Sequence, residues 1–101
     1  MGNIVAKFGG SSLSDAGQFR KVHDILLMDA RRVYVVPSAP GRRFDKDDKV
    51  TDLLYALYRL HRDGGDWQGV FARVADRYRQ IAQSLSLACA LEEELDRIRA
   101  N

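Results

Sequence analysis

The residues most suited to chemistry lie at positions 7–12, Lys-Phe-Gly-Gly-Ser-Ser, directly after a short apolar run. Two adjacent glycines let a ligand approach the backbone, and a helix starting behind them would present unpaired N–H groups to an anion. Lys7 adds a point charge that suits a phosphate oxygen. The segment is not a Walker motif, because the lysine precedes the glycines. From these residues alone, a phosphate-binding turn and a purely structural turn are equally good interpretations.

A second turn of small residues lies at positions 35–41, Val-Val-Pro-Ser-Ala-Pro-Gly, and it also ends an apolar run. If the two runs are neighbouring parallel strands, their carboxyl ends meet at one edge of the sheet, where open α/β sheets bind ligands. Ser38 and Gly41 would then lie beside Gly9 and Gly10 and form a cleft. An exit loop punctuated by prolines is the competing interpretation.

The elements that must position these turns follow from periodicity. Residues 4–8 are short, β-branched and mostly apolar, which predicts a buried strand, and residues 33–36 predict a second one. Apolar residues at spacings of three and four predict an amphipathic helix over residues 14–31 between them. Side-chain oxygens that could cap this helix are on Ser11, Ser12, Ser14 and Asp15. Strand, helix and strand of this length form a parallel βαβ unit, so we predict an α/β fold.

Helical periodicity dominates the rest of the chain. It resumes at Val50, stops at Gly64-Gly65, and continues over residues 66–100 with a slack point at residues 84–86. Three or four helices therefore follow the βαβ unit. Two strands are too few for a complete doubly wound sheet, which has about five or six. Either the strands pair with each other under an unusually helical cover, or the chain is the leading piece of a larger domain.

Composition bounds the classes of protein that fit. The 101 residues are 46% hydrophobic and 30% charged with a net charge of +2, which indicates one small, soluble, folded domain. No apolar run reaches the roughly 18–20 residues of a membrane span, and no signal peptide is visible, so we expect a cytoplasmic protein without a membrane partner. Neither half carries a basic stripe, so we expect no nucleic-acid partner. The mixed charges of residues 42–49 favour a solvated loop.

The remaining reactive residue types favour structural roles. Cys89 is the only cysteine and lies in a helical apolar stretch, so we predict a buried thiol and no disulfide. His23 and His61 have no cysteine or carboxylate at ligand spacing, so we expect surface or helix-boundary positions and no metal site.

Three segments in order resemble a known family. Residues 4–12, Ile-Val-Ala-Lys-Phe-Gly-Gly-Ser-Ser, resemble the N-terminal signature of aspartate kinases, which are members of the amino-acid kinase family. Residues 35–41 resemble the second glycine/serine loop of that family, and Lys-Val-Thr-Asp-Leu-Leu at 49–54 resembles the helix start that follows it. The resemblance covers about residues 3–60, whereas residues 61–101 are similar only in being helical.

The resemblance implies ATP-dependent phosphorylation of the side-chain carboxylate of L-aspartate to 4-phospho-L-aspartate, a step toward lysine and related amino acids, with ATP and Mg²⁺ as cofactors. It implies that Lys7, Gly9 and Gly10 hold the phosphates and that Lys7 also acts in catalysis. The positions that match contacts to the amino acid or the reacting phosphate are Ser11, Ser38 and Thr51. Phosphoryl transfer needs mainly positioning, cations and N–H donors around developing charge, which these residue types supply.

The family's members are several times longer than this chain. The resemblance therefore implies an N-terminal fragment of an amino-acid kinase domain, an incomplete form of its three-layer fold. Residues 1–60 would hold the βαβ unit with the substrate and phosphate loops, and residues 61–101 the later helices. We expect this chain to be inactive alone and to form a homo-oligomer. The alternatives are a fragment of another amino-acid kinase and a non-catalytic helical interaction domain.

Overall fold

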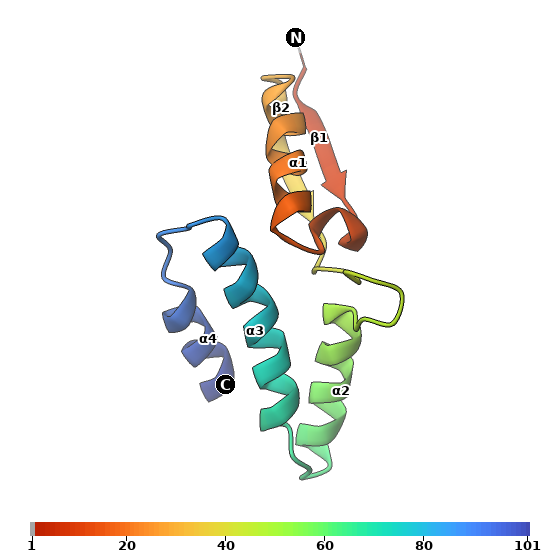
Figure 1. Ribbon diagram of the computed structural model, residues 1–101, viewed down its shortest axis with the longest axis vertical. Coiled ribbons are helices and arrows are strands. Elements are labelled where there is room, and N and C mark those ends of the chain that lie inside the picture. The colour runs from red at the N-terminus through yellow and green to blue at the C-terminus, as the bar shows by residue number, and fades with distance from the viewer. Residues whose placement is uncertain (1) are drawn as a thin grey trace. The chain divides into compact units, whose positions relative to one another are not determined.

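The computed structural model describes residues 2–101 and confirms the α/β fold, with a parallel βαβ unit followed by three helices (Figure 1). The elements in chain order are β1 (Ile4–Phe8), a 3₁₀ turn η1 (Gly10–Leu13), α1 (Ala16–Leu27), β2 (Arg32–Pro37), α2 (Val50–Arg62), α3 (Gln68–Ser84) and α4 (Leu91–Ala100). Contacts divide the chain into two compact units, one ending at Thr51 and the other comprising Asp52–Asn101. No helix within residues 2–101 combines the length and the apolar character that crossing a bilayer requires.

Strands β1 and β2 pair in parallel, so the carboxyl ends of both lie at the same edge of the sheet. Lys7 is registered opposite Val36, and Phe8 opposite Pro37. Exposed and half-buried residues alternate along β1, because successive side chains point to opposite faces of a strand. The prediction that residues 4–8 form a buried strand was therefore right in the strand and wrong in its burial. Helix α1 runs alongside the sheet (Figure 1). Lys7 is one of the exposed residues of β1.

Helix α1 is shorter than the predicted range of 14–31. Its N-cap is Asp15, whose carboxylate accepts a hydrogen bond from the Gln18 N–H at 3.0 Å. The predicted serines do not cap it, because the residues before Asp15 wind into the separate turn η1. Ser14 is buried, and its hydroxyl donates to the Ser11 carbonyl at 3.3 Å.

A local ion pair explains why α1 ends early. Beyond Leu27, the Asp29 carboxylate accepts from the Arg31 backbone N–H at 3.0 Å and from its guanidinium at 2.7 Å. These bonds hold the pKa of the Asp29 carboxyl well below its usual range. Arg32 donates back to the Ile25 carbonyl in the last turn of α1, which satisfies one of the acceptors that a helix end exposes. The chain thereby leaves the helix and enters β2.

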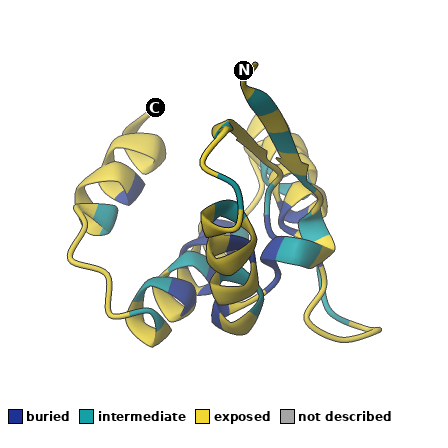
Figure 2. Ribbon diagram, turned by 90° about the horizontal axis from the view of Figure 1, so that it is seen from above, coloured by how far each residue is buried: buried dark blue, intermediate teal, exposed yellow. Residues whose placement is uncertain are grey.

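The second unit is built on helix packing. Phe71, Ala75 and Leu95 form a buried cluster that joins α3 to α4. Figure 2 shows the buried stretches of the chain in dark blue among mostly exposed ribbon. The partly buried residues packed against this cluster are Leu57, Trp67 and Leu91. Val74 and Ile81 of α3 are also buried, as the helical periodicity of residues 66–100 predicts. Core formation therefore follows the apolar stripe of α3.

The predicted slack point at residues 84–86 is confirmed as the end of α3, because Ser86 takes a positive φ of 54°. The break is longer than predicted, since α4 begins only at Leu91. Cys89 lies in this connection and is exposed, so the prediction of a buried thiol was wrong. Hydrophobic periodicity predicts which face of a helix a residue occupies only if the residue is in a helix. Cys89 lies between the end of α3 and the start of α4. His23 and His61 are exposed, as predicted.

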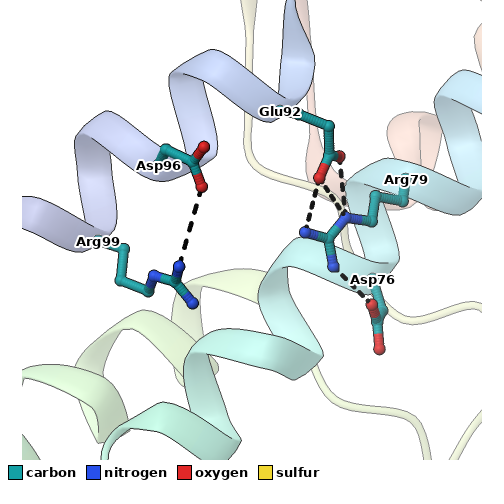
Figure 3. Close-up of polar contacts among 5 residues, drawn as sticks. All are labelled: Asp76, Arg79, Glu92, Asp96 and Arg99. Atoms are coloured by element: carbon teal, nitrogen blue, oxygen red, sulfur yellow. Dashed lines mark hydrogen bonds and ion pairs between the residues drawn. The ribbon is translucent and has the colours of Figure 1, made fainter.

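A charged group bridges the same connection (Figure 3). The Arg79 guanidinium donates to the Glu92 carboxylate at 2.8 and 2.9 Å and to the Asp76 carboxylate at 3.1 Å. Residues on consecutive helices are thereby joined across the break. The hydrogen bonds from Arg79 lower the pKa of the Glu92 carboxyl.

Candidate active site

The two small-residue turns predicted from the sequence lie side by side at the carboxyl edge of the sheet. The Ser38 N–H donates to the Phe8 carbonyl at 2.9 Å, which continues the strand ladder by one step. The Gly41 N–H then donates to the Gly10 carbonyl at 2.8 Å. Parallel pairing of the strands brings the turns together, because it places both carboxyl ends at one edge.

Close backbone contact explains two of the glycines. A Cβ at position 41 would lie 2.7 Å from the Gly10 carbonyl carbon and 2.9 Å from the Ser11 backbone nitrogen. A Cβ at position 10 would lie 3.1 Å from the Ala39 carbonyl oxygen. A Cβ at position 9 would meet nothing within 4 Å, so packing does not require glycine there. The pair Gly10 and Gly41 thus lets two backbone loops touch without side chains between them.

A pocket of about 370 Å³ opens between these loops. Four of the six predicted site residues line it: Gly10, Ser11, Ser38 and Thr51. The three hydroxyl-bearing residues come from different segments, namely η1, the turn after β2, and the first turn of α2. The structure therefore gathers most of the predicted site around one hollow, while the roles of these residues stay predictions.

Lys7 and Gly9 are not among the lining residues. Lys7 is exposed on β1, one position before the end of the strand. Gly9 is the exposed residue that precedes η1, with an extended backbone at φ −75° and ψ 172°. Lys7 lies three residues before Gly10 in the chain, and its ammonium is carried on a flexible four-carbon stem.

Two cations line the pocket that the sequence did not single out. Arg42 and Lys49 belong to the charged segment interpreted above as a solvated loop, yet both face the hollow. No aspartate or glutamate of the described residues lines it. The mixed charges of residues 42–49 do not show which acids pair with which bases, so the sequence did not indicate that these two cations line a pocket. The position of Arg42 directly after Gly41 is the signal that could have placed it at the site.

The loop that carries these cations is held by its own hydrogen bonds. Asp47 accepts from the Arg43 backbone N–H at 2.9 Å and from its guanidinium at 2.6 and 2.9 Å. This side-chain pairing raises the pKa of Arg43. The Arg42 Nε donates to the Asp47 carbonyl at 3.1 Å. Of the aspartates in this loop, Asp47 is thus paired with Arg43.

The start of α2 is fixed in the same way. Val50 is fully buried, and its N–H donates to the Pro40 carbonyl at 3.0 Å. Its two neighbours in the chain, Lys49 and Thr51, both line the pocket. A buried anchor therefore positions one cation and one hydroxyl.

The pocket suits an oxyanion better than a metal ion. Hydroxyl donors, a close glycine backbone and two cations are the groups that stabilise carboxylate or phosphate oxygens. Within residues 2–101, no three histidine, cysteine, aspartate or glutamate side chains come together as metal ligands would. The arrangement can therefore hold and orient a negatively charged substrate.

The same fold occurs within a solved aspartate kinase. The chain superposes with a TM-score of 0.94 on the crystal structure of aspartate kinase from Clostridium acetobutylicum, at 40% identity, over 100% of this chain and 23% of that one. No family model matches the chain.

Two curated relatives are also named as aspartokinases. The chain is 41% identical over 91 residues to aspartokinase 3 of Bacillus subtilis, which covers 90% of this chain and 20% of the relative. It is 29% identical over 110 residues to the lysine-sensitive aspartokinase 3 of Escherichia coli, covering 91% of this chain and 24% of the relative. The chain is therefore homologous to aspartokinases over about nine-tenths of its length, and it spans about a fifth to a quarter of theirs.

Proposed function

We propose that this chain supplies the phosphate- and aspartate-binding loops of an aspartate kinase, which converts L-aspartate and ATP to 4-phospho-L-aspartate and ADP. One observation carries the proposal. In a chain homologous to aspartokinases, the predicted residues Gly10, Ser11, Ser38 and Thr51 line one pocket free of carboxylates. The homology favours aspartate over the substrates of other amino-acid kinases, and it favours an enzyme segment over a purely helical interaction domain.

The chemistry asks little of the protein beyond placement and charge. A side-chain carboxylate oxygen of aspartate forms a bond to the γ-phosphorus as the bond to the bridging oxygen of the β-phosphate breaks. No general base is needed, because the carboxylate is already ionised at neutral pH. Ser38 and Thr51 would donate hydrogen bonds that orient the reacting oxyanions, and the Gly10 backbone would let a phosphate approach closely.

Lys7 has a separate role in the proposal. Its ammonium would offset the charge that shifts among the phosphate oxygens during transfer. Its exposed place on β1 leaves the side chain free to reach a phosphate bound against Gly9 and Gly10. Bound ATP would supply the transferable phosphoryl group. For Mg²⁺ the described residues offer no set of three ligands, so we assign it none in this chain.

We further propose that residues 1–60 hold the substrate loops of an amino-acid kinase domain and residues 61–101 its following helices. Since relatives are four to five times as long, the remaining parts of the reaction centre would come from segments outside these 101 residues. The chain by itself is then inactive. A homo-oligomer and a cytoplasmic location stay predictions.

A chimera tests the proposed function directly. The matched segment of the Bacillus subtilis aspartokinase 3 is exchanged for this chain, and acyl phosphate formation is followed by trapping with hydroxylamine. We expect an active chimera that loses about 100-fold or more of its activity on Lys7→Ala, by the scale of losing one electrostatic stabiliser.

Two neighbouring serines provide a test variant and its matched control. Ser11→Ala removes a hydroxyl that lines the pocket, whereas Ser12→Ala removes one that does not. Ser11→Ala should impair the chimera and Ser12→Ala should leave it near the parent. A folded chimera without any activity would contradict the proposal.

A further inference from the structure

We propose that Arg42 and Lys49 are the oxyanion anchor of the pocket, binding a carboxylate or phosphate group of the substrates. This inference rests on the proposed function, because it names the charged contacts of that same site. It is independent of Lys7, which does not line the pocket. The two residues come from opposite ends of one loop, after Gly41 and before Val50.

The charge of the pocket carries the first step. Arg42 and Lys49 contribute two positive charges to its wall, and the described residues contribute no carboxylate to it. Neither side chain forms an ion pair with any of residues 2–101, while the neighbouring Arg43 is paired with Asp47 at 2.6 Å. A concave site with uncompensated charge of one sign concentrates ligands of the opposite sign.

The geometry of the loop carries the second step. Arg42 donates through Nε to the Asp47 carbonyl at 3.1 Å, which holds the guanidinium by one edge and leaves its terminal nitrogens for another acceptor. Lys49 is placed by the buried Val50 beside it. Both cations are thus attached to a loop that hydrogen bonds hold near each of its ends.

The surrounding donors carry the third step. Ser11, Ser38 and Thr51 add three hydroxyls to the same wall. Thr51 lies in the first turn of α2, so the positive end of that helix adds to the field at the pocket. A tetrahedral phosphate and a planar carboxylate both accept this combination of cations and hydroxyl donors. The shared chemistry is therefore an oxyanion, and the source is decided by experiment.

The test uses this chain itself and two probes, inorganic phosphate and L-aspartate, each titrated at low ionic strength while backbone amide shifts are recorded. Saturable shifts should centre on Ser38, Gly41 and Thr51. Lys49→Gln and Arg42→Gln should each weaken binding about fivefold to tenfold, the scale of one charge-assisted contact. Tighter binding of L-aspartate would assign the anchor to a carboxylate, and tighter binding of phosphate to the nucleotide.

Lys46→Gln is the matched control, because it removes the same charge from the same loop at an exposed position outside the pocket lining. Circular dichroism confirms that each variant keeps its fold. If Lys49→Gln and Lys46→Gln weaken binding equally, the effect is general charge and the anchor is refuted while the proposed function stands. The anchor is also refuted if neither probe gives saturable shifts at these amides, and the chimera then judges the function separately.

Discussion

Single glycines decide whether the candidate site can assemble. The two loops touch through Gly10 and Gly41, and the nearest atoms to an added Cβ at position 41 belong to backbone. Backbone cannot rotate away as a flexible side chain can, so the loops must separate to admit even one methyl group.

We therefore expect Gly41→Ala to lower the free energy of unfolding of the first unit by about 1–3 kcal/mol, the usual cost of overpacking. Chemical denaturation followed by circular dichroism measures this change. Gly9→Ala is the control, because Gly9 has an ordinary φ of −75° and open space around it. Equal stabilities of the two variants would show that the loops do not touch in solution.

Site residues differ in how far the sequence could reveal them. Ser38 and Gly10 were predictable as neighbours, because the rule for parallel strands places their turns at one edge of the sheet. Arg42 and Lys49 were not, since a run of mixed charges does not show which acid is paired with which base. Only the hydrogen bonds of Asp47 make that assignment. Lys7 was prominent in the sequence, yet it lies outside the pocket lining.

At the scale of the elements, the packing of α4 on α3 depends on very few residues. Leu95 is 5% exposed and forms a buried cluster with Phe71 and Ala75. Trp67 packs against the same cluster, so its fluorescence reports on this packing.

Leu95→Ala should destabilise the second unit by about 2–5 kcal/mol, because it removes buried methyl groups and leaves a cavity. The loss should appear in the denaturation curve read by Trp67 fluorescence. Ile98→Ala on the same helix removes a side chain that is 55% exposed, and it should cost under about 1 kcal/mol. If both substitutions cost the same, α4 does not pack on α3 through Leu95.

The ion pair across the connection gives the second unit a pH dependence. Hydrogen bonds from Arg79 lower the pKa of Glu92 from the ordinary 4.5. A depressed pKa in the folded state means that the unfolded chain takes up protons first as the pH falls. The pairing of Glu92 is therefore fully stabilising above pH 4.5 and is lost as the pH falls through the lower folded value.

Glu92→Gln should remove this part of the acid sensitivity and lower the melting temperature at neutral pH more than at acid pH. Glu93→Gln is matched to it, since Glu93 also lies in the first turn of α4 and carries the same charge near the helix terminus. The melting temperatures of both variants, measured across the acid range, show whether the ion pair of Glu92 with Arg79 contributes to the pH dependence of stability. Identical pH profiles for the two would refute the contribution of Arg79.

The sequence predicted which helices and strands form better than it predicted the residues at which they end. The strands and α2 follow directly from apolar runs that stop at glycine or proline. The end of α1 depends on the pairing of Asp29 with Arg31, and the start of α4 depends on the turn at Ser86. Both are local hydrogen-bonding or backbone features that hydrophobic periodicity does not encode, which is why Cys89 was placed wrongly on a helix.

At the scale of the whole molecule, the two-stranded sheet carries the site with little burial of its own. Along β2, the side chains of Val33, Tyr34, Val35 and Val36 are each at least 41% exposed. The sequence indicated this imbalance between strands and helices, and the structure shows the two strands paired only with each other among residues 2–101. The pocket is nevertheless formed entirely by residues of the first unit, so ligand binding is a fair test of this chain alone.

The most direct measurement is a two-dimensional amide NMR titration of the 101-residue chain with Mg-ATP and then with L-aspartate. The account predicts saturable shifts that centre on Gly10, Ser38 and Thr51, with residues of α4 unaffected. Ser38→Ala should weaken the response to at least one ligand. Shifts confined to the second unit, or a dispersed spectrum in which neither ligand shifts any amide, would contradict substrate binding by these loops in this chain alone.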